Sequence, residues 1–156
     1  MLVGTDFEIV NVGWQKLHPD AKVPVYGSDE AAGADLCAIE GVWLKPNEIT
    51  LVKTGIAIEL PKGVEAQVRP RSGLALRHGV TVVNAPGTID SDYRGEIGVV
   101  LTLVGRGQFA GYKIEPGDRI AQLVIAPVLR AKFLATGGVL SETKRGAGGF
   151  GSTGAR

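Results

Sequence analysis

Residues 49–69 read ITLVKTGIAIEL, PKG and VEAQVR in succession, and this stretch decides the fold class. On both sides of Pro61-Lys62-Gly63 the chain is rich in Val, Ile, Leu and Thr, which favour β-strands. Pro61 fixes φ and Gly63 tolerates a positive φ, so the connection between the two runs is a tight turn. We therefore expect two strands, Ile49–Leu60 and Val64–Arg69, joined by that turn.

Short apolar stretches continue to alternate with turn residues along the rest of the chain, which contains 23 Gly and 8 Pro. Two more turns, Lys45-Pro46-Asn47 and Glu115-Pro116-Gly117-Asp118, combine a Pro with a residue that tolerates positive φ. No internal repeat and no second folded domain stands out. Further strands are expected at Glu8–Val12, Ala34–Ala38, Val80–Asn84, Glu96–Val104 and Arg119–Pro127.

A single short segment has the character of a helix. Ser72 is predicted to cap residues 73–78, and Gly79 is predicted to end the helix. Everything else is strand or turn, so the predicted fold class is all-β. Within that class we expect a jelly-roll-like β-barrel or sandwich with one short helix.

The composition is that of an ordinary soluble globular protein, with 156 residues, 44% hydrophobic and 21% charged. Because 17 basic residues face 16 acidic ones, the basic excess of nucleic-acid and membrane-surface proteins is missing, and we expect neither partner. The N-terminus lacks the regions of a signal peptide, and the apolar run 99–104 is far too short to span a bilayer. Cys37 is the one cysteine, so no internal disulfide is possible, and we expect a cytoplasmic location.

The Gly-rich C-terminal stretch that begins at Arg145 cannot form a core element. Residues 146–151 read GAGGFG and match the dinucleotide fingerprint, but no helix can follow so close to the end of the chain. Arg145 and the main-chain N–H groups suit a phosphate chain, and Phe150 suits the face of a base. A plain mobile tail is an equally good interpretation of these residue types.

Two other segments carry polar groups at places that suit ligand binding. Residues 85–96, between two apolar strands, form a longer loop than a hairpin needs and could place Asp90 and Asp92 on one face. Arg71 and Ser72 stand where a strand ends and the helix opens, a favourable place for an anion. A solvated acidic turn and an ordinary helix cap are the corresponding structural interpretations.

Other kinds of site are disfavoured by the residues themselves. Ser72, His78 and Asp90 include the side chains of a hydrolase triad, but no G-x-S-x-G elbow surrounds the serine. His18 and His78 are the only histidines, and they lack the spacing of zinc ligands. Cys37 is interpreted as a small core hydrophobe on a strand.

Taken together, five motifs in sequence order resemble those of the trimeric dUTPase family, along nearly the whole chain. Each motif alone is weak, but five in the same order, with their glycines and charged residues in place, are specific. No departure falls at a position that the resemblance would make catalytic. The matching segments are residues 32–36 (AGADL), 70–75 (PRSGLA), 84–95 (NAPGTIDSDYRG), 117–122 (GDRIAQ) and 145–154 (RGAGGFGSTG).

The resemblance implies a jelly-roll homotrimer with a β-barrel domain over residues 1–144 and a mobile arm over residues 145–156. The arm would be exchanged between subunits and close over a neighbour's active site. The implied activity is Mg²⁺-dependent hydrolysis of dUTP to dUMP and pyrophosphate, which supplies dUMP for thymidylate synthesis and keeps uracil out of DNA. dUTP and the other copies of the chain would be the partners.

The resemblance also implies roles for individual residues. Asp90 would be the general base for the water that attacks the α-phosphorus, and Asp35 would contact Mg²⁺ through water. Asn84 and the backbone around Gly98 would bind uracil, Tyr93 would pack under the sugar, and Phe150 would stack on the base. The groups expected to bind the phosphates are Arg71, Ser72, Gly73, Gln122 and Arg145, and Gly87, Thr88, Ile89, Gly151 and Ser152 would complete the substrate site.

Two other functions remain as alternatives. A dCTP deaminase-like enzyme would share the fold and part of the third motif, but it would need a further carboxylate to activate water at the base. A non-catalytic nucleotide-binding regulatory protein would have no use for Asp35, Asp90 and Arg145 together.

Overall fold

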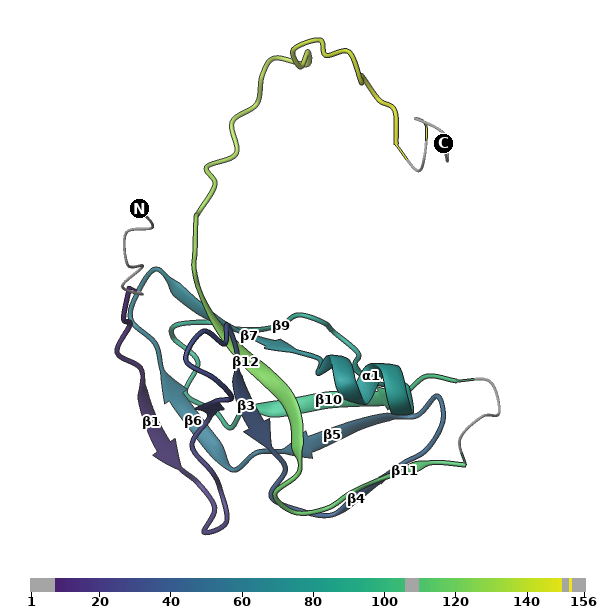
Figure 1. Cartoon of the computed structure of the whole chain (residues 1–156). Helices are drawn as coiled ribbons and strands as arrows, with labels where there is room; N and C mark the ends of the chain where they lie inside the picture. The colour runs from purple at the N-terminus through teal and green to yellow at the C-terminus, as the bar shows by residue number, and fades with distance from the viewer. Residues whose placement is uncertain (1–7, 106–109, 150–151, 153–156) are drawn as a thin grey trace, which may run out of the picture.

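The computed structural model describes residues 8–105, 110–149 and 152. Strands dominate it, and the single helix, α1 (Ser72–His78), lies at one side of the body (Figure 1). The all-β prediction with one short helix is therefore confirmed. The strands are β1 (Gly13–Lys16), β2 (Val25–Tyr26), β3 (Ala34–Cys37), β4 (Val42–Leu44), β5 (Ile49–Lys53), β6 (Ile56–Glu59), β7 (Val64–Arg69), β8 (Val80–Val82), β9 (Gly87–Ile89), β10 (Gly98–Leu103), β11 (Tyr112–Ile114) and β12 (Arg119–Pro127).

The strands form antiparallel sheets whose order departs from the order of the chain. The largest sheet runs β2-β3-β12-β7-β9, and a second runs β5-β10-β8. Two further antiparallel pairs, β1-β6 and β4-β11, complete the body. β12 lies inside the largest sheet, between β3 and β7, so a strand from the C-terminal part of the chain joins strands from its first half.

The core lies between the inward faces of these sheets. Along β10, Val99, Leu101 and Leu103 are buried and alternate with half-buried residues, as expected for a strand with one face on the core. Burying such side chains contributes about 1.5–3 kcal/mol each. The one buried polar side chain of the described core, Thr54, donates from Oγ1 to the main-chain oxygen of Ile97 at 2.6 Å, so it is satisfied.

Two predicted strands match the structure residue for residue, Val64–Arg69 and Arg119–Pro127. The expected strand Ile49–Leu60 is instead two strands, because the chain breaks at Gly55, whose φ is 69°. A side chain there would lie 2.9 Å from the Cβ atoms of His18 and Ala21, so the break needs glycine for space as well as for φ.

The expected first strand, Glu8–Val12, is wrong, because the strand that pairs with β6 begins at Gly13. All four residues of β1 are exposed, so the pattern of apolar residues does not mark it. The other predicted strands are present in the structure but are one to a few residues shorter at their ends than predicted. The strands that the pattern missed, β2, β4, β9 and β11, are two or three residues long.

The helix begins one residue earlier than predicted and is capped differently. Arg71, with extended backbone, is the N-cap residue, and no side chain caps the helix, so the predicted Ser72 cap is wrong. At the other end Gly79 has the left-handed conformation, and its N–H donates to the carbonyls of Leu74 and Ala75, as predicted. No helix in the described part of the chain is long and apolar enough to cross a membrane.

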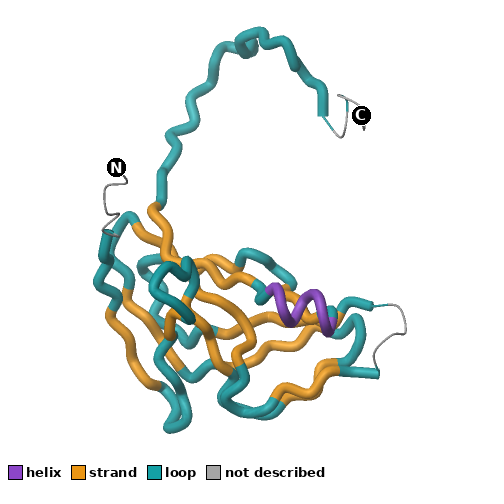
Figure 2. Tube along the Cα trace, viewed as in Figure 1, coloured by secondary structure: helices purple, strands orange, loops and turns teal. Residues whose placement is uncertain are grey.

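The N–H of Val128 still donates to the carbonyl of Gly63 at 2.8 Å, and beyond it the chain leaves the body and arches away from it (Figure 1). Residues 128–149 contain neither helix nor strand, as the tube in Figure 2 shows. Large apolar side chains are nevertheless exposed along it, Leu129 at 97% and Phe133 at 94%. The extended segment thus begins well before residue 145, and the division into a barrel domain and an arm at that residue stays a prediction.

Candidate active site

A cavity of about 330 Å³ opens between β9, β10 and the loop that follows β9. Most of the residues predicted to bind a base and a sugar lie together in its wall. The lining residues are Leu51, Val68, Asn84, Gly87, Thr88, Ile89, Asp90, Tyr93, Glu96, Gly98 and Val100.

One wall of the cavity exists because β9 pairs with β7. Gly87 lies opposite Val68, and Thr88 lies opposite Gln67. A side chain at Gly87 would lie 3.1 Å from Nδ2 of Asn84 and 3.3 Å from Cβ of Val68, so its absence lets the strand lie against both. Residues 85–96 were predicted to form one long hairpin loop. This prediction is wrong, because residues 87–89 form β9, which pairs with β7 in the largest sheet.

The floor of the cavity is the outward face of β10. Gly98 has no side chain, so its main chain is open to the cavity. A Cβ atom at this position would lie 2.6 Å from Cδ1 of Leu51, so the close approach of Leu51 requires glycine here. Leu51 itself is 60% exposed and lies opposite Val100 in the β5–β10 pair. Sequence reasoning missed Leu51. Its signal was the alternation in β5, which puts Val52 in the core and Leu51 on the opposite face.

The loop from Asp90 to Glu96 is fixed by several hydrogen bonds. The N–H of Tyr93 donates to the carbonyl of Asp90 at 3.1 Å, and its hydroxyl donates to the carbonyl of Glu96 at 3.0 Å. Oε1 of Glu96 in turn accepts from the N–H of Gly55 at 2.8 Å, which ties the loop to the barrel. The ring of Tyr93 is thereby held against the cavity.

The carboxylate of Asp90 is exposed at the end of β9 and lines the cavity. No ion pair or side-chain hydrogen bond joins it to any other residue in the described ranges. It is therefore open to water and to a ligand, as a general base has to be.

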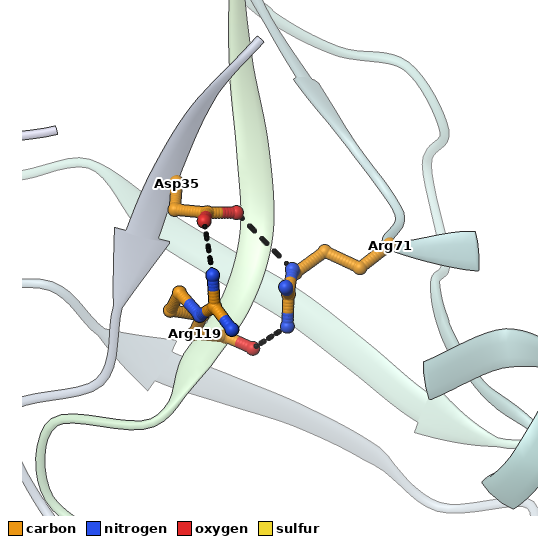
Figure 3. A network of polar contacts seen from close by, with 3 residues as sticks. All are labelled: Asp35, Arg71 and Arg119. Carbon is orange, nitrogen blue, oxygen red and sulfur yellow. Dashed lines mark hydrogen bonds and ion pairs between the residues drawn. The ribbon is translucent and has the colours of Figure 1, made fainter. Parts of the chain in front are cut away.

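A second polar group gathers around Asp35, whose side chain is only 11% exposed (Figure 3). Nη1 of Arg119 donates to Oδ2 at 3.0 Å, and Nε of Arg71 lies 3.1 Å from Oδ1. Nη1 of Arg71 also donates to the main-chain oxygen of Arg119 at 3.1 Å. Two guanidinium groups against one carboxylate leave this trio positive, which favours an anion beside it.

Gln122 lies next to this trio on the same sheet. It is opposite Asp35 in the β3–β12 pair and opposite Arg69 in the β7–β12 pair, so these side chains share the outward face. Ser72 and Gly73 follow Arg71 directly as the first residues of α1. Four of the predicted phosphate-binding residues thus lie in one region of the structure: Arg71, Ser72, Gly73 and Gln122.

None of these predicted phosphate-binding residues lines the cavity, and neither does Arg145. Arg145 lies in the extended C-terminal segment, where its Nε donates to the carbonyl of Gly148 at 2.8 Å. Ser152 donates from its N–H to the carbonyl of Gly149 at 3.0 Å, while Phe150 and Gly151 lie outside the described residues. A single chain therefore presents a base-sized cavity, a cationic group and an arm as three separate parts.

The structure also bears on the other groups considered from the sequence. Ser72 and His78 lie at opposite ends of α1, and the ring of His78 packs on Tyr112 at 4.7 Å between centroids, so no triad forms. No set of three metal-binding side chains gathers anywhere in the described ranges. Cys37 is half-buried on the outward face of β3 rather than in the core, and burial raises the pKa of its thiol.

The chain matches the family model described as dUTPase over residues 19–154. A deoxyuridine 5′-triphosphate nucleotidohydrolase from an Anaeromyxobacter species is 61% identical over 136 residues, which cover 87% of this chain and 90% of that protein. The protein of the same name from Wolinella succinogenes is 54% identical over 139 residues, which cover 89% of this chain and 91% of that protein.

Solved structures show the same fold. The dUTPase of Staphylococcus bacteriophage 80alpha with dUPNHPP has a TM-score of 0.82 and 27% identity, and the match covers 92% of this chain and 98% of that one. A mutant dUTPase from phage phi11 of S. aureus, described for its coordination of a structural Mg(II) ion, has a TM-score of 0.74 and 24% identity. That match covers 81% of this chain and 96% of the other, and at this identity it supports the fold alone.

Proposed function

Because the chain belongs to the dUTPase family, we propose that it is a dUTP diphosphatase, which hydrolyses dUTP to dUMP and pyrophosphate. The observation that carries this proposal is the cavity of about 330 Å³ whose wall holds Asn84, Gly98, Tyr93 and Asp90 together. An amide, bare main chain and an aromatic ring suit a base and a sugar. The carboxylate of Asp90, which makes no ion pair with any described residue, supplies the base for hydrolysis.

Uracil is distinguished from cytosine by groups whose hydrogen bonds uracil completes and cytosine does not. The amide of Asn84 and the main chain at Gly98 face the cavity and can pair with the polar edge of the base. Cytosine exchanges a donor for an acceptor on that edge and would leave buried polar groups unpaired. The ring of Tyr93, held by its hydrogen bond to Glu96, packs under the sugar and leaves no room for a ribose 2′-hydroxyl.

Asp90 takes the proton of the water that attacks the α-phosphorus. An aspartate is ionised at neutral pH, and a general base in this position typically accelerates a reaction by about 10²- to 10⁴-fold. Its position at the end of β9, beside Tyr93 and the base-sized cavity, suits a water next to the innermost phosphate. The leaving group is pyrophosphate.

The triphosphate binds to the cationic group around Arg71, with Ser72, Gly73 and Gln122 beside it. The positive charge of the two arginines in this group exceeds the negative charge of the Asp35 carboxylate. Guanidinium groups bind phosphate oxygens through paired hydrogen bonds. Because these residues do not line the cavity of their own chain, we propose that they act on a nucleotide held in the cavity of a neighbouring copy.

The residues present fit a Mg²⁺ ion that is held mainly by the substrate. Mg²⁺ dehydrates reluctantly and keeps several waters, so it needs few protein ligands. Oδ1 of Asp35 accepts no hydrogen bond within the described part of the chain, although Nε of Arg71 lies 3.1 Å from it, so it would have a lone pair left for a water on the ion. Bound in this way, Mg²⁺ would neutralise charge on the phosphate oxygens.

The C-terminal segment belongs, in this proposal, to an exchanged arm of a homotrimer. Leu129 and Phe133 are almost fully exposed on a single chain, which is costly unless another surface covers them. Arg145 would reach the phosphates, and the predicted contacts of Phe150, Gly151 and Ser152 would close the site over the nucleotide. The product dUMP would serve thymidylate synthesis, and removal of dUTP would keep uracil out of DNA in the cytoplasm.

A pyrophosphate-release assay with Mg²⁺ tests the proposed function. We expect release from dUTP, and release from dCTP lower by at least about 30-fold in kcat/KM, because two mispaired groups cost roughly 1–3 kcal/mol each. Ammonia should not be released from dCTP. Ammonia release from dCTP would show a deaminase instead, and binding of dUTP without pyrophosphate release would show a non-catalytic binding protein.

A further inference from the structure

We propose that Arg119 is a positioning residue, which holds Arg71 in the orientation that binds the triphosphate. This role rests on the proposed function, because it needs a triphosphate to be bound at Arg71. It concerns a residue that lies outside the predicted set of site residues. Arg119 makes two separate contacts with the trio of Figure 3, one through its side chain and one through its main chain.

The side chain of Arg119 occupies one half of the Asp35 carboxylate. Its Nη1 donates to Oδ2 at 3.0 Å, while Nε of Arg71 lies 3.1 Å from Oδ1. An arginine alone with a carboxylate tends to bind both oxygens through two parallel hydrogen bonds. Because Arg119 holds one oxygen, Arg71 can reach only the other and keeps part of its guanidinium for another acceptor.

The main chain of Arg119 fixes a second point of Arg71. Its carbonyl oxygen accepts from Nη1 of Arg71 at 3.1 Å. Nε of Arg71 forms an ion pair with Oδ1 of Asp35 at 3.1 Å, without the geometry of a hydrogen bond, and this pair together with the Nη1 hydrogen bond orients the plane of the guanidinium. No described residue accepts a hydrogen bond from Nη2 of Arg71, so this nitrogen is the one that remains for a phosphate oxygen.

A β-bulge in β12 is what brings Arg119 to this place. Arg119 lies opposite Cys37, but Ala121 already lies opposite Leu36, so Ile120 is one extra residue in β12. In a regular strand, positions 119 and 122 would point to opposite faces. The extra residue puts Arg119 on the same outward face as Gln122, while Ile120 and Ala121 are both buried.

Binding of a non-hydrolysable imido analogue of dUTP tests the role in the full-length protein. Arg119→Met should weaken it roughly 10- to 100-fold, the usual effect of losing a hydrogen bond to a charged group. The affinity for dUMP, which has one phosphate, should change by less than about threefold. Arg119→Lys keeps the charge and one donor to Asp35 and should restore binding of the analogue to within about fivefold.

The sharpest measurement is a double-mutant cycle with Arg71→Met. If Arg119 acts through Arg71, then Arg119→Met should change affinity for the analogue by less than about threefold once Arg71 is gone. Lys113→Met removes an exposed cation on β11 that pairs with Glu115, and it serves as the control for loss of charge. Thermal unfolding midpoints and dUMP binding show whether each variant is folded.

The possible results separate the two proposals. Additive effects of the two substitutions, or no effect of Arg119→Met, would overturn the positioning role. The proposed function would still stand in that case, provided that the protein without substitutions binds the analogue. An unchanged chain that binds the analogue no more tightly than dUMP would overturn both. Failure of Arg119→Lys to restore binding would also count against positioning through the Asp35 contact.

Discussion

Replacing Asp90 with Asn should lower kcat for dUTP by about 10²- to 10⁴-fold while binding of the nucleotide is retained. An amide of the same shape cannot take a proton from water, but it leaves the wall of the cavity intact. The Asp90 side chain makes no ion pair within the described ranges, so its neutralisation strands no partner. Turnover of dUTP and affinity for its imido analogue are the two measurements.

Asp92 provides a matched control for the Asp90 substitution. It is an exposed carboxylate two residues further along the same loop, and it does not line the cavity of about 330 Å³. Asp92→Asn should therefore leave kcat within about threefold, the ordinary range for a surface change. Equal losses in both variants would mean that the loop needs negative charge rather than a base at residue 90.

Deleting residues 145–156 should lower kcat/KM for dUTP by about 10²- to 10³-fold, because the donors of the arm no longer reach the phosphates. The barrel should remain folded, since the hydrogen bonds of Arg145 run to Gly148 and none joins it to a described residue of the body. Thermal unfolding of the shortened chain checks this point. A loss of less than about threefold would remove the arm from the proposed site.

Mixing the shortened chain with Asp90→Asn chains then tests whether the arm is exchanged. A site with an intact Asp90 can receive an arm only from the other kind of chain, so random trimers should recover activity at about one quarter of their sites. Were each arm to close over its own chain, neither kind of chain could supply a complete site. Activity that stays at the level of the separate variants after refolding together would therefore contradict exchange.

The fold was predictable from the sequence wherever turn chemistry and length were both clear. Gly63 and Gly117 have φ values of 84° and 88° at the predicted turns, and Asn47 has 61°. The nine residues of β12 were long and apolar enough to be recognised as one strand. Strands of two or three residues, such as β2 and β9, are held by their neighbours in the sheet, and no local pattern marks them.

The site was predictable only in part. An unusually long connection marked Asp90 and Tyr93, and the family motifs marked Arg71 and Gln122. Leu51 lies in none of the motifs, and the motif at residues 117–122 contains Arg119 without showing its contact with Asp35, because both contacts depend on strand register. Leu51 reaches the cavity through its pairing opposite Val100, and Arg119 reaches Asp35 through a bulge.

The central claim is that water, activated by the carboxylate at residue 90, attacks the phosphorus nearest the sugar. Hydrolysis of dUTP in ¹⁸O-enriched water tests it most directly, because the attacking oxygen stays on the phosphorus that it reaches. Mass spectrometry should find the heavy oxygen in dUMP and none in pyrophosphate. Label in the pyrophosphate would place the attack at the middle phosphorus and contradict the account.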